Sequence, residues 1–245
     1  MLEISLILVA AVVVLIAAFT QGLTGFGFVM LGAPLMGLLV EPKVVVPTVL
    51  VQSSIINIVI LIRAWRWINT RRVLALAIPG ALASPLGAYF LVTFDQSSLK
   101  VITGLVVTIT AIIMLTGYRK VVSQDIRGCV PVGAVSGLLN ASTGLAGPAV
   151  VLYFANQGVA STEFRSTIVA HFLLITIITF PIFLFGDIFT KDQVIFSIIL
   201  LPFALVGSIL GVLASKFVTQ SVFLKIALLL VIFAGVSSSV AGLYS

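Results

Sequence analysis

Long apolar segments without charges recur along this 245-residue sequence, and they leave few ways for it to fold. Only 8% of its residues are charged and 61% are apolar, whereas a soluble domain carries about 25% charged residues. Because so few charges cannot solvate a protein surface, lipid must be the solvent for most of the chain. The sequence therefore predicts an all-α polytopic membrane protein that forms a single domain over residues 1–245.

Ten hydrophobic segments can be placed, in two groups of five. They are expected at 2–20, 28–40, 44–62, 73–94 and 99–118, and again at 128–139, 145–156, 166–185, 194–215 and 221–243. The two segments 128–139 and 145–156 would each be about 18 Å long, too short to cross about 30 Å of hydrocarbon. We therefore predict 8–10 transmembrane segments, with broken or re-entrant helices at the start of each group.

Glycine-rich breaks interrupt the apolar sequence at 21–27 and at 140–147. Three pairs are each separated by 119 residues: Gln21 and Asn140, Thr24 and Thr143, and Gly25 and Gly144. Non-helical backbone within a membrane must be buried in protein or line a cavity. The helices that follow the breaks would direct unpaired N–H groups and positive dipole ends at them, which favours an anion. The alternative is that the glycines only permit close helix packing.

The correspondence between the two groups extends beyond the breaks. Thr48 and Gln52 match Thr167 and His171 at the same offset of 119, and Pro79 matches Pro202 at an offset of 123. These matches predict a tandem duplication with repeats at 1–118 and 127–245. Chance similarity between apolar segments is the alternative.

The basic residues predict how the repeats are oriented. If each pair of segments around a break returns to its own side, ten Lys and Arg residues lie on one side and three on the other; eight full crossings give eight and five. The first arrangement separates charge better. It predicts inverted repeats in the cell (inner) membrane, with both termini extracytoplasmic. Because the basic residues are scattered, the net charge of +6 does not indicate a nucleic-acid partner.

The candidate substrate-binding residues are glycines of the breaks and polar residues placed within the membrane. Thr48 and Gln52 share one helix face, as do Thr167 and His171. Buried polar side chains in membranes often mark pathways, although an interhelical hydrogen bond is the alternative. Ser53, Ser54 and Asn57 continue the polar stripe. The predicted site comprises Gln21, Thr24, Gly25, Gly27, Thr48, Gln52, Asn140, Thr143, Gly144, Thr167 and His171.

All seven carboxylates lie at segment ends or in turns, so none is placed to bind a cation at mid-membrane. The expected substrate is therefore an anion or a neutral solute, and we expect neither a metal nor a cofactor. If protons are coupled to transport, His171 is the group expected to titrate. The single cysteine, Cys129, is expected to be a packing residue.

The two breaks carry the motifs Gly22-x-x-Gly25-x-Gly27, with Pro34, and Ser142-Thr-Gly-x-x-Gly147-Pro148. In these motifs, and over its whole length, the chain resembles the TauE/SafE family of sulfite exporters, also called the sulfonate uptake permease family. The resemblance implies a secondary transporter, not an enzyme, that exports sulfite or an organosulfonate such as sulfoacetate. Alternating access around a midplane site is the expected mechanism. The expected partners are a small anionic substrate and membrane lipids, with a homodimer left open.

Two other functions remain as alternatives. The first is a small-anion channel in the same fold. The second, less favoured, is an intramembrane hydrolase with Ser142 as nucleophile and His171 as base. No third orienting residue is visible for that pair, and Ser142 has no counterpart in the first repeat.

Overall fold

The computed structural model describes residues 4–117, 126–155, 157, 161–215, 217 and 220–244, without the side chains at 63, 161 and 220–223. In this part of the chain every regular element is helical, which confirms the all-α prediction. The helices are α1 (Ile4–Thr24), α2 (Phe28–Gly37), α3 (Pro42–Ala64), α4 (Thr70–Thr93), α5 (Gln96–Leu115), α6 (Cys129–Thr143), α7 (Gly147–Ala155), α8 (Ser161–Phe185), α9 (Lys191–Ala214) and α10 (Gln220–Leu243), with short 3-10 helices η1 (Trp65–Trp67) and η2 (Ile126–Gly128).

Seven of the described helices are long and apolar enough to cross a membrane: α1, α3, α4, α5, α8, α9 and α10. Many large apolar side chains on their outer surfaces are exposed, among them Leu82 of α4 and Phe233 of α10. An apolar exterior of this extent fits contact with lipid and not with water. The chain is therefore a multi-pass membrane protein.

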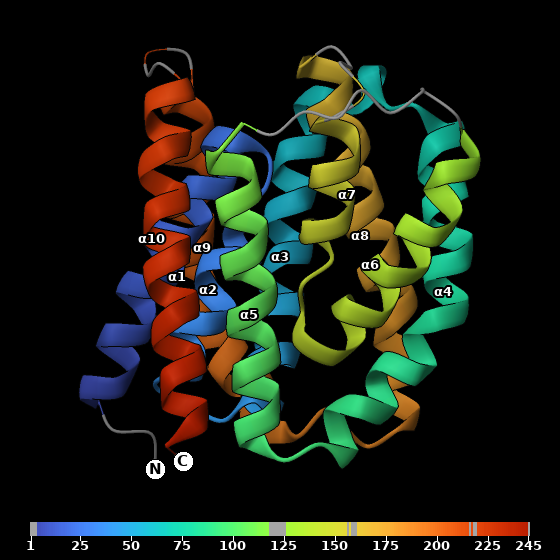
Figure 1. Ribbon diagram of the computed structural model, residues 1–245. Helices are drawn as coiled ribbons and strands as arrows, with labels where there is room; N and C mark the ends of the chain where they lie inside the picture. Colours follow the sequence, from blue (N-terminus) through green and yellow to red (C-terminus); the bar gives the residue numbers. More distant parts are fainter. Residues whose placement is uncertain are drawn as a thin grey trace.

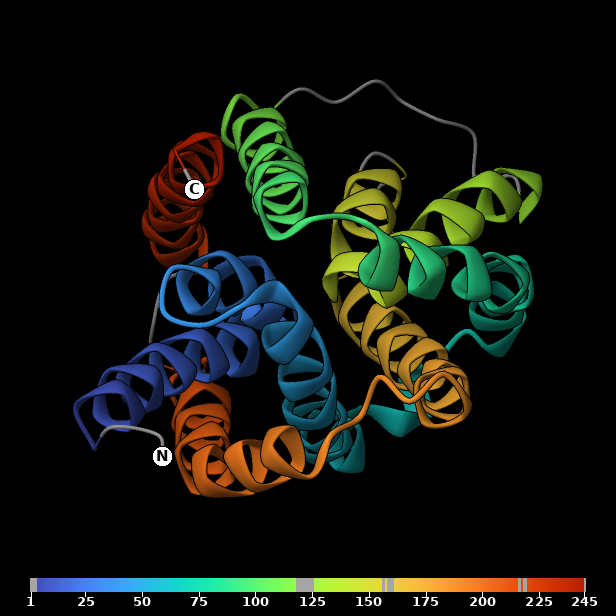
Figure 2. The same ribbon diagram turned by 90° about the horizontal axis from the view of Figure 1, so that it is seen from below.

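Most helices run between the top and the bottom of the molecule (Figure 1). The short helices α6 and α7 form a hairpin that enters from the top and returns to the top, and α8 then runs to the bottom. The start of α1 and the end of α10 both lie at the bottom. Seen from below, the connections α2–α3, α4–α5 and α8–α9 are nearest to the viewer (Figure 2).

The two ends of the molecule differ in charge. The top end, which we call the basic face, carries the helix ends that hold Arg66, Arg71, Arg72, Arg127, Arg165 and Lys225. The bottom end, the opposite face, holds Lys43, Lys100 and Lys191 among the described residues. This helix order places the basic residues as expected for pairs of segments that return to their own side.

Both breaks are shorter than the sequence indicated. α1 continues through Thr24 and α6 through Thr143, so the non-helical backbone is limited to 25–27 and 144–146. The amide of Gly25 still donates to the carbonyl oxygen of Gln21, at 2.7 Å. Gly25 and Gly144 then adopt φ values of +88° and +79°, which end the helices and which glycine adopts without steric cost. The expected start of the second helix at 145 is also wrong, because α7 begins at Gly147.

Helices of the two halves pack across one another. α1 packs mainly against α9, α6 against α4, and α5 against α10, while α3 contacts α8 in the interior. A Cβ atom on Gly104 of α5 would lie under 3.0 Å from the carbonyl oxygen of Gly235 in α10. Glycine at both positions thus permits the close packing of α5 against α10. Gly22, expected in the first break, is a helical residue of α1 in equally close contact with α9.

Candidate functional site

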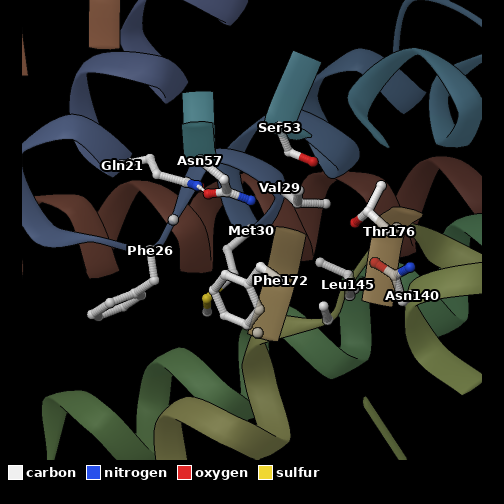
Figure 3. Close-up of a pocket in the computed structure, with 14 residues that line it drawn as sticks. Gln21, Phe26, Val29, Met30, Ser53, Asn57, Asn140, Leu145, Phe172 and Thr176 are labelled. Atoms are coloured by element: carbon white, nitrogen blue, oxygen red, sulfur yellow. Dashed lines mark hydrogen bonds between the residues drawn. The ribbon is translucent and has the colours of Figure 1, made fainter. Parts of the chain in front are cut away.

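The two breaks face one small cavity inside the bundle (Figure 3). Its volume is about 20 Å³, which is room for about one water molecule. None of the residues that line it carries a formal charge. The lining consists of Gln21, Phe26, Gly27, Val29, Met30, Ser53, Asn57, Asn140, Gly144, Leu145, Ala146, Gly147, Phe172 and Thr176.

Ten of these fourteen residues form pairs at the offset of 119 that the breaks show in the sequence. The pairs are Gln21 with Asn140, Phe26 with Leu145, Gly27 with Ala146, Ser53 with Phe172, and Asn57 with Thr176. The cavity thus lies where equivalent positions of the two halves meet. Asn57 and Thr176 are a pair at this offset that was not used to propose the duplication, which stays a prediction.

Gln21 joins three helices at the cavity. Its Oε1 accepts a hydrogen bond from the backbone N–H of Phe28, the first residue of α2, at 3.0 Å. Its Nε2 donates to Oδ1 of Asn57 in α3, at 2.5 Å. Because α2 begins after Gly27, whose side chain cannot cap it, the Gln21 carbonyl serves as the cap. Gln21 is 3% exposed. Its two hydrogen bonds therefore hold α1, α2 and α3 together where they meet the cavity.

The free polar groups of the cavity include donors. Nδ2 of Asn57 is buried and has no hydrogen-bond partner among the described residues. Asn140 lies across the cavity from Asn57 (Figure 3) and donates its Nδ2 to Thr179 of α8, at 3.1 Å. An unpaired buried donor is costly unless a ligand or water meets it. Nδ2 of Asn57 is therefore a suitable donor for an oxyanion.

A buried chain of hydrogen bonds connects His171 to the second break. The Ser136 hydroxyl of α6 donates to the carbonyl oxygen of Ala146, at 2.7 Å, and lies 2.9 Å from Nε2 of His171. A hydroxyl has one proton to donate, so the histidine must donate from Nε2. Its Nδ1 is then an acceptor without a partner in the described part of the chain. The imidazole thus holds the break through Ser136 and does not line the cavity.

Replacement of Ser136 by alanine should destabilise the protein by about 1–3 kcal/mol, because it leaves the imidazole N–H and a buried carbonyl without partners. Thermal unfolding of the detergent-solubilised protein measures the change. Ser197→Ala is the matched control, since Ser197 is as buried but its hydroxyl bonds only Gln193 of its own helix. An equal effect of the two substitutions would contradict the linking role of Ser136.

Four residues of the predicted site line the cavity: Gln21, Gly27, Asn140 and Gly144. The other seven are placed elsewhere. The hydroxyls of Thr24 and Thr143 donate to carbonyl oxygens of their own helices, at 2.8 and 2.9 Å. Oγ1 of Thr167 accepts from the backbone N–H of Asn69. Gly25, Thr48, Gln52 and His171 lie near the cavity helices but outside the lining.

Several lining residues were absent from the predicted site. Ser53 and Asn57 belong to the polar stripe noted on the third segment, and Thr176 could have been found by adding the offset of 119 to Asn57. Phe26, Met30 and Phe172 carry no polar signal. The sequence could not single them out, because apolar residues occur throughout such a chain and those at the cavity look like all the others.

Ser142 and His171, the pair considered for a hydrolase, are not partners. The Ser142 hydroxyl donates to the carbonyl oxygen of Leu138 in its own helix, at 2.9 Å. His171 instead meets Ser136. The Ser136 proton is directed at the Ala146 carbonyl and not at the cavity. The pairing of Ser142 with His171 that was considered for a hydrolase is therefore not formed.

One cation approaches the first break. Arg165 of α8 is half-buried, and its guanidinium donates to the carbonyl oxygen of Gly22 near the end of α1. A Cβ atom on Gly25 would overlap the Arg165 side chain, so the glycine leaves room for it. The arginine places a positive charge beside the break on its basic-face side.

A family model described as "Sulfite exporter TauE/SafE" matches residues 10–238, which is nearly the whole chain. No curated protein matches the chain, and no solved structure does.

Proposed function

Because this chain belongs to the TauE/SafE family of sulfite exporters, we propose that it is a secondary transporter that exports a small sulfur oxyanion. The substrate is sulfite or an organosulfonate such as sulfoacetate. The observation that carries the proposal is the uncharged cavity between the two breaks, where buried donors face each other and no carboxylate is present in the lining.

The proposed site binds an oxyanion through neutral donors. Nδ2 of Asn57 is the unpaired donor of the lining, which also contains Thr176. Ser53 lines the cavity as well, but its hydroxyl donates to the carbonyl oxygen of Leu50 in its own helix, at 3.1 Å, and must leave that bond to meet a ligand. The first turns of α2 and α7 begin at the breaks and add their positive dipole ends. Arg165 adds positive potential at the first break without entering the lining. Together these groups suit three acceptor oxygens around a single sulfur.

A cavity of about 20 Å³ is too small for sulfite, so the two breaks are closed around it in this conformation. Substrate entry requires the two breaks to separate. Backbone breaks at glycines can change conformation at low steric cost, and the helices on either side can move as rigid units. This supports alternating access around the cavity, as in transporters built from inverted repeats with discontinuous helices.

The proposed orientation places the basic face in the cytoplasm and both termini outside. An inside-negative potential then favours anion efflux by about 2.3 kcal/mol per charge per 100 mV. Export could run on this potential alone. Uptake would need a coupled ion, and His171 is the group we propose to carry a proton in that case.

Transport in proteoliposomes tests the function. With an imposed potential of about 100 mV, a monovalent sulfonate should distribute to a concentration ratio of about 50 between the compartments. Empty liposomes and liposomes with the potential collapsed are the controls. Flux that responds neither to the potential nor to a pH gradient would contradict both energetic schemes.

Binding of the substrate class is tested separately by the thermal stability of the purified protein. Sulfite and organosulfonates at 100 times their dissociation constant should stabilise it by about 2.7 kcal/mol, and sulfate and carboxylates by less. If none of these anions stabilises the protein, the proposal of an anion-binding site is wrong. Flux that never saturates, with single-channel currents, would assign a channel instead of a carrier.

A further inference from the structure

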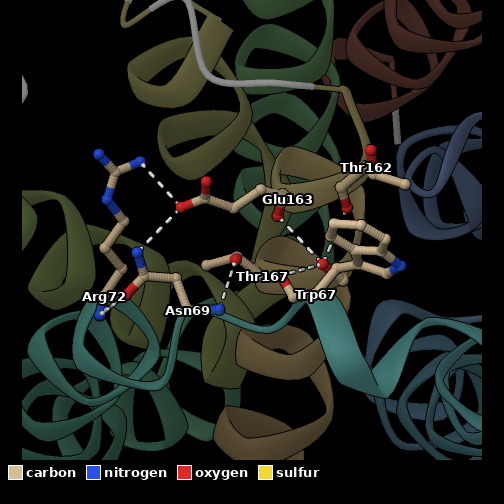
Figure 4. Close-up of polar contacts among 7 residues, drawn as sticks. Trp67, Asn69, Arg72, Thr162, Glu163 and Thr167 are labelled. Atoms are coloured by element: carbon tan, nitrogen blue, oxygen red, sulfur yellow. Dashed lines mark hydrogen bonds and ion pairs between the residues drawn. The ribbon is translucent and has the colours of Figure 1, made fainter.

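On the basic face, polar bonds fasten the start of α8 to the segment that leads into α4 (Figure 4). The backbone N–H of Asn69 donates to Oγ1 of Thr167, at 3.1 Å. The Ser166 hydroxyl donates to the carbonyl oxygen of Trp67, at 2.7 Å. Nδ2 of Asn69 donates to Oε1 of Glu163, at 2.9 Å. Segments about 95 residues apart in the sequence are thus held together.

Glu163 is the charged centre of this junction. Nη1 of Arg72 lies 3.8 Å from the same carboxylate oxygen that Asn69 meets, and the two side chains are 13% (Arg72) and 35% (Glu163) exposed. The Arg72 guanidinium also lies over the ring of Phe154 in α7, 5.4 Å from its centroid. Glu163 therefore joins α8 to α4, and through Arg72 it connects to α7.

The junction and the cavity involve the same two helices, α7 and α8, at different points along their lengths. α7 begins at Gly147, which lines the cavity, and Phe154 lies near its other end. α8 carries Glu163 near its start and the lining residue Thr176 further along. A displacement of α7 and α8 away from α4 would therefore move part of the cavity lining as well.

The opposite face has an equivalent junction with fewer bonds. There the start of α9 meets the start of α3, and Nε2 of Gln193 donates to the carbonyl oxygen of Lys43, at 3.0 Å. Thr190 caps α9 as Asn69 caps α4. Among the described residues, more hydrogen bonds therefore cross the junction on the basic face than cross its counterpart on the opposite face.

We propose that Glu163 is a positioning residue for transport: it holds α7 and α8 against α4 and so keeps the central cavity closed towards the basic face. The Gln193–Lys43 bond is its weaker counterpart on the opposite face. This role rests on the transport function proposed above. Release of the Glu163 contacts opens the cavity to the basic face, and their formation closes it.

The test measures from which side the cavity can be reached. Cys129 is the only cysteine in the sequence, so Cys129→Ala gives a background in which Ser53→Cys reports on the cavity. A charged, membrane-impermeant thiol reagent is applied to vesicles of each orientation. A separate protein with Thr116→Cys, at an exposed position at the end of α5, identifies the side on which the basic face lies.

Glu163→Gln should raise labelling of the cavity cysteine from the basic face about tenfold, because the ion pair with Arg72 is lost and the hydrogen bond from Asn69 no longer meets a charged acceptor. Labelling from the opposite face should stay unchanged. Gln193→Ala should produce the reverse pattern. The control is Glu41→Gln, since Glu41 also stands at a helix start but makes no side-chain capping bond. Exchange of the charges, Glu163→Arg with Arg72→Glu, should restore part of the closure.

Unchanged labelling in Glu163→Gln would overturn the proposal, and so would an equal rise from both faces, which indicates loosened packing. The assay needs no substrate. If labelling changes from one side only but the protein does not transport a sulfur oxyanion, the role of Glu163 stands and the proposed substrate is wrong. If the protein transports sulfite but Glu163→Gln changes labelling from neither face, the proposed substrate stands and the role of Glu163 is wrong.

Discussion

Replacement of Gln21 by glutamate is expected to weaken anion transport by roughly a thousandfold. The new carboxylate could still accept the Phe28 N–H, but it could not donate to Asn57, and it would place a negative charge in the cavity lining. Two like charges about 4 Å apart repel by about 4 kcal/mol at an effective dielectric constant of about 20. That energy corresponds to the stated factor. Lower pH, which protonates the introduced group, should restore part of the activity.

Substrate flux in proteoliposomes measures this effect, with Gln21→Leu and Gln52→Leu as a matched pair. Gln21 makes two side-chain hydrogen bonds, whereas both polar atoms of the Gln52 amide are buried without a partner among the described residues. Removal of an unpaired amide costs little folding energy. Gln21→Leu should therefore be far more harmful to flux. Equal losses of flux in the two variants would indicate that the substrate binds near Gln52 and not in the cavity.

Alanine at Gly137 is expected to prevent stable packing of α6 against α4. Its Cβ atom would lie under 3.0 Å from the carbonyl oxygen of Gly80, and backbone cannot rotate away as a side chain can. The same holds for Gly22 in α1 and the carbonyl oxygen of Ser208 in α9. Overpacking of this kind costs about 1–3 kcal/mol, and more where helices must separate. We expect at least about 3 kcal/mol for each substitution.

Thermal unfolding followed by the fluorescence of Trp65 and Trp67 measures this loss. Gly37→Ala is the control, because nothing lies within 4 Å of the Cβ atom that it would add. That substitution should change stability by no more than about 0.5 kcal/mol. A Gly137→Ala protein as stable as Gly37→Ala would show that the α4–α6 contact is looser than the structure indicates.

The fold could be predicted to a large extent because lipid imposes a simple pattern on the sequence. Each long apolar segment became a helix, and Glu41, Asn69 and Asp95 stand at helix starts, as polar residues between segments should. The positions of both breaks were predicted correctly, but their predicted lengths were too great. Their polar residues belong to the helices, and only three residues at each break, 25–27 and 144–146, lie outside them.

The candidate site was predicted only in part, because side-chain direction depends on packing between distant segments. Gln21 and Thr24 are three residues apart on one helix, yet only Gln21 reaches the cavity. The partner of His171 could not be foreseen either. Ser136 lies on another helix, and the offset of 119 leads from it to Ala17, which has no hydroxyl.

The packing of α1 against α9 has a consequence for synthesis. About 170 residues separate the end of α1 from the start of α9, and a ribosome needs about 10–30 s to add them. α6, in contrast, follows its partner α4 after about 35 residues. α1 must therefore wait in the membrane with the surface that packs against α9 uncovered. The contact between α1 and α9 thus forms later than the contact between α4 and α6, and neither half can finish folding before the other has been made.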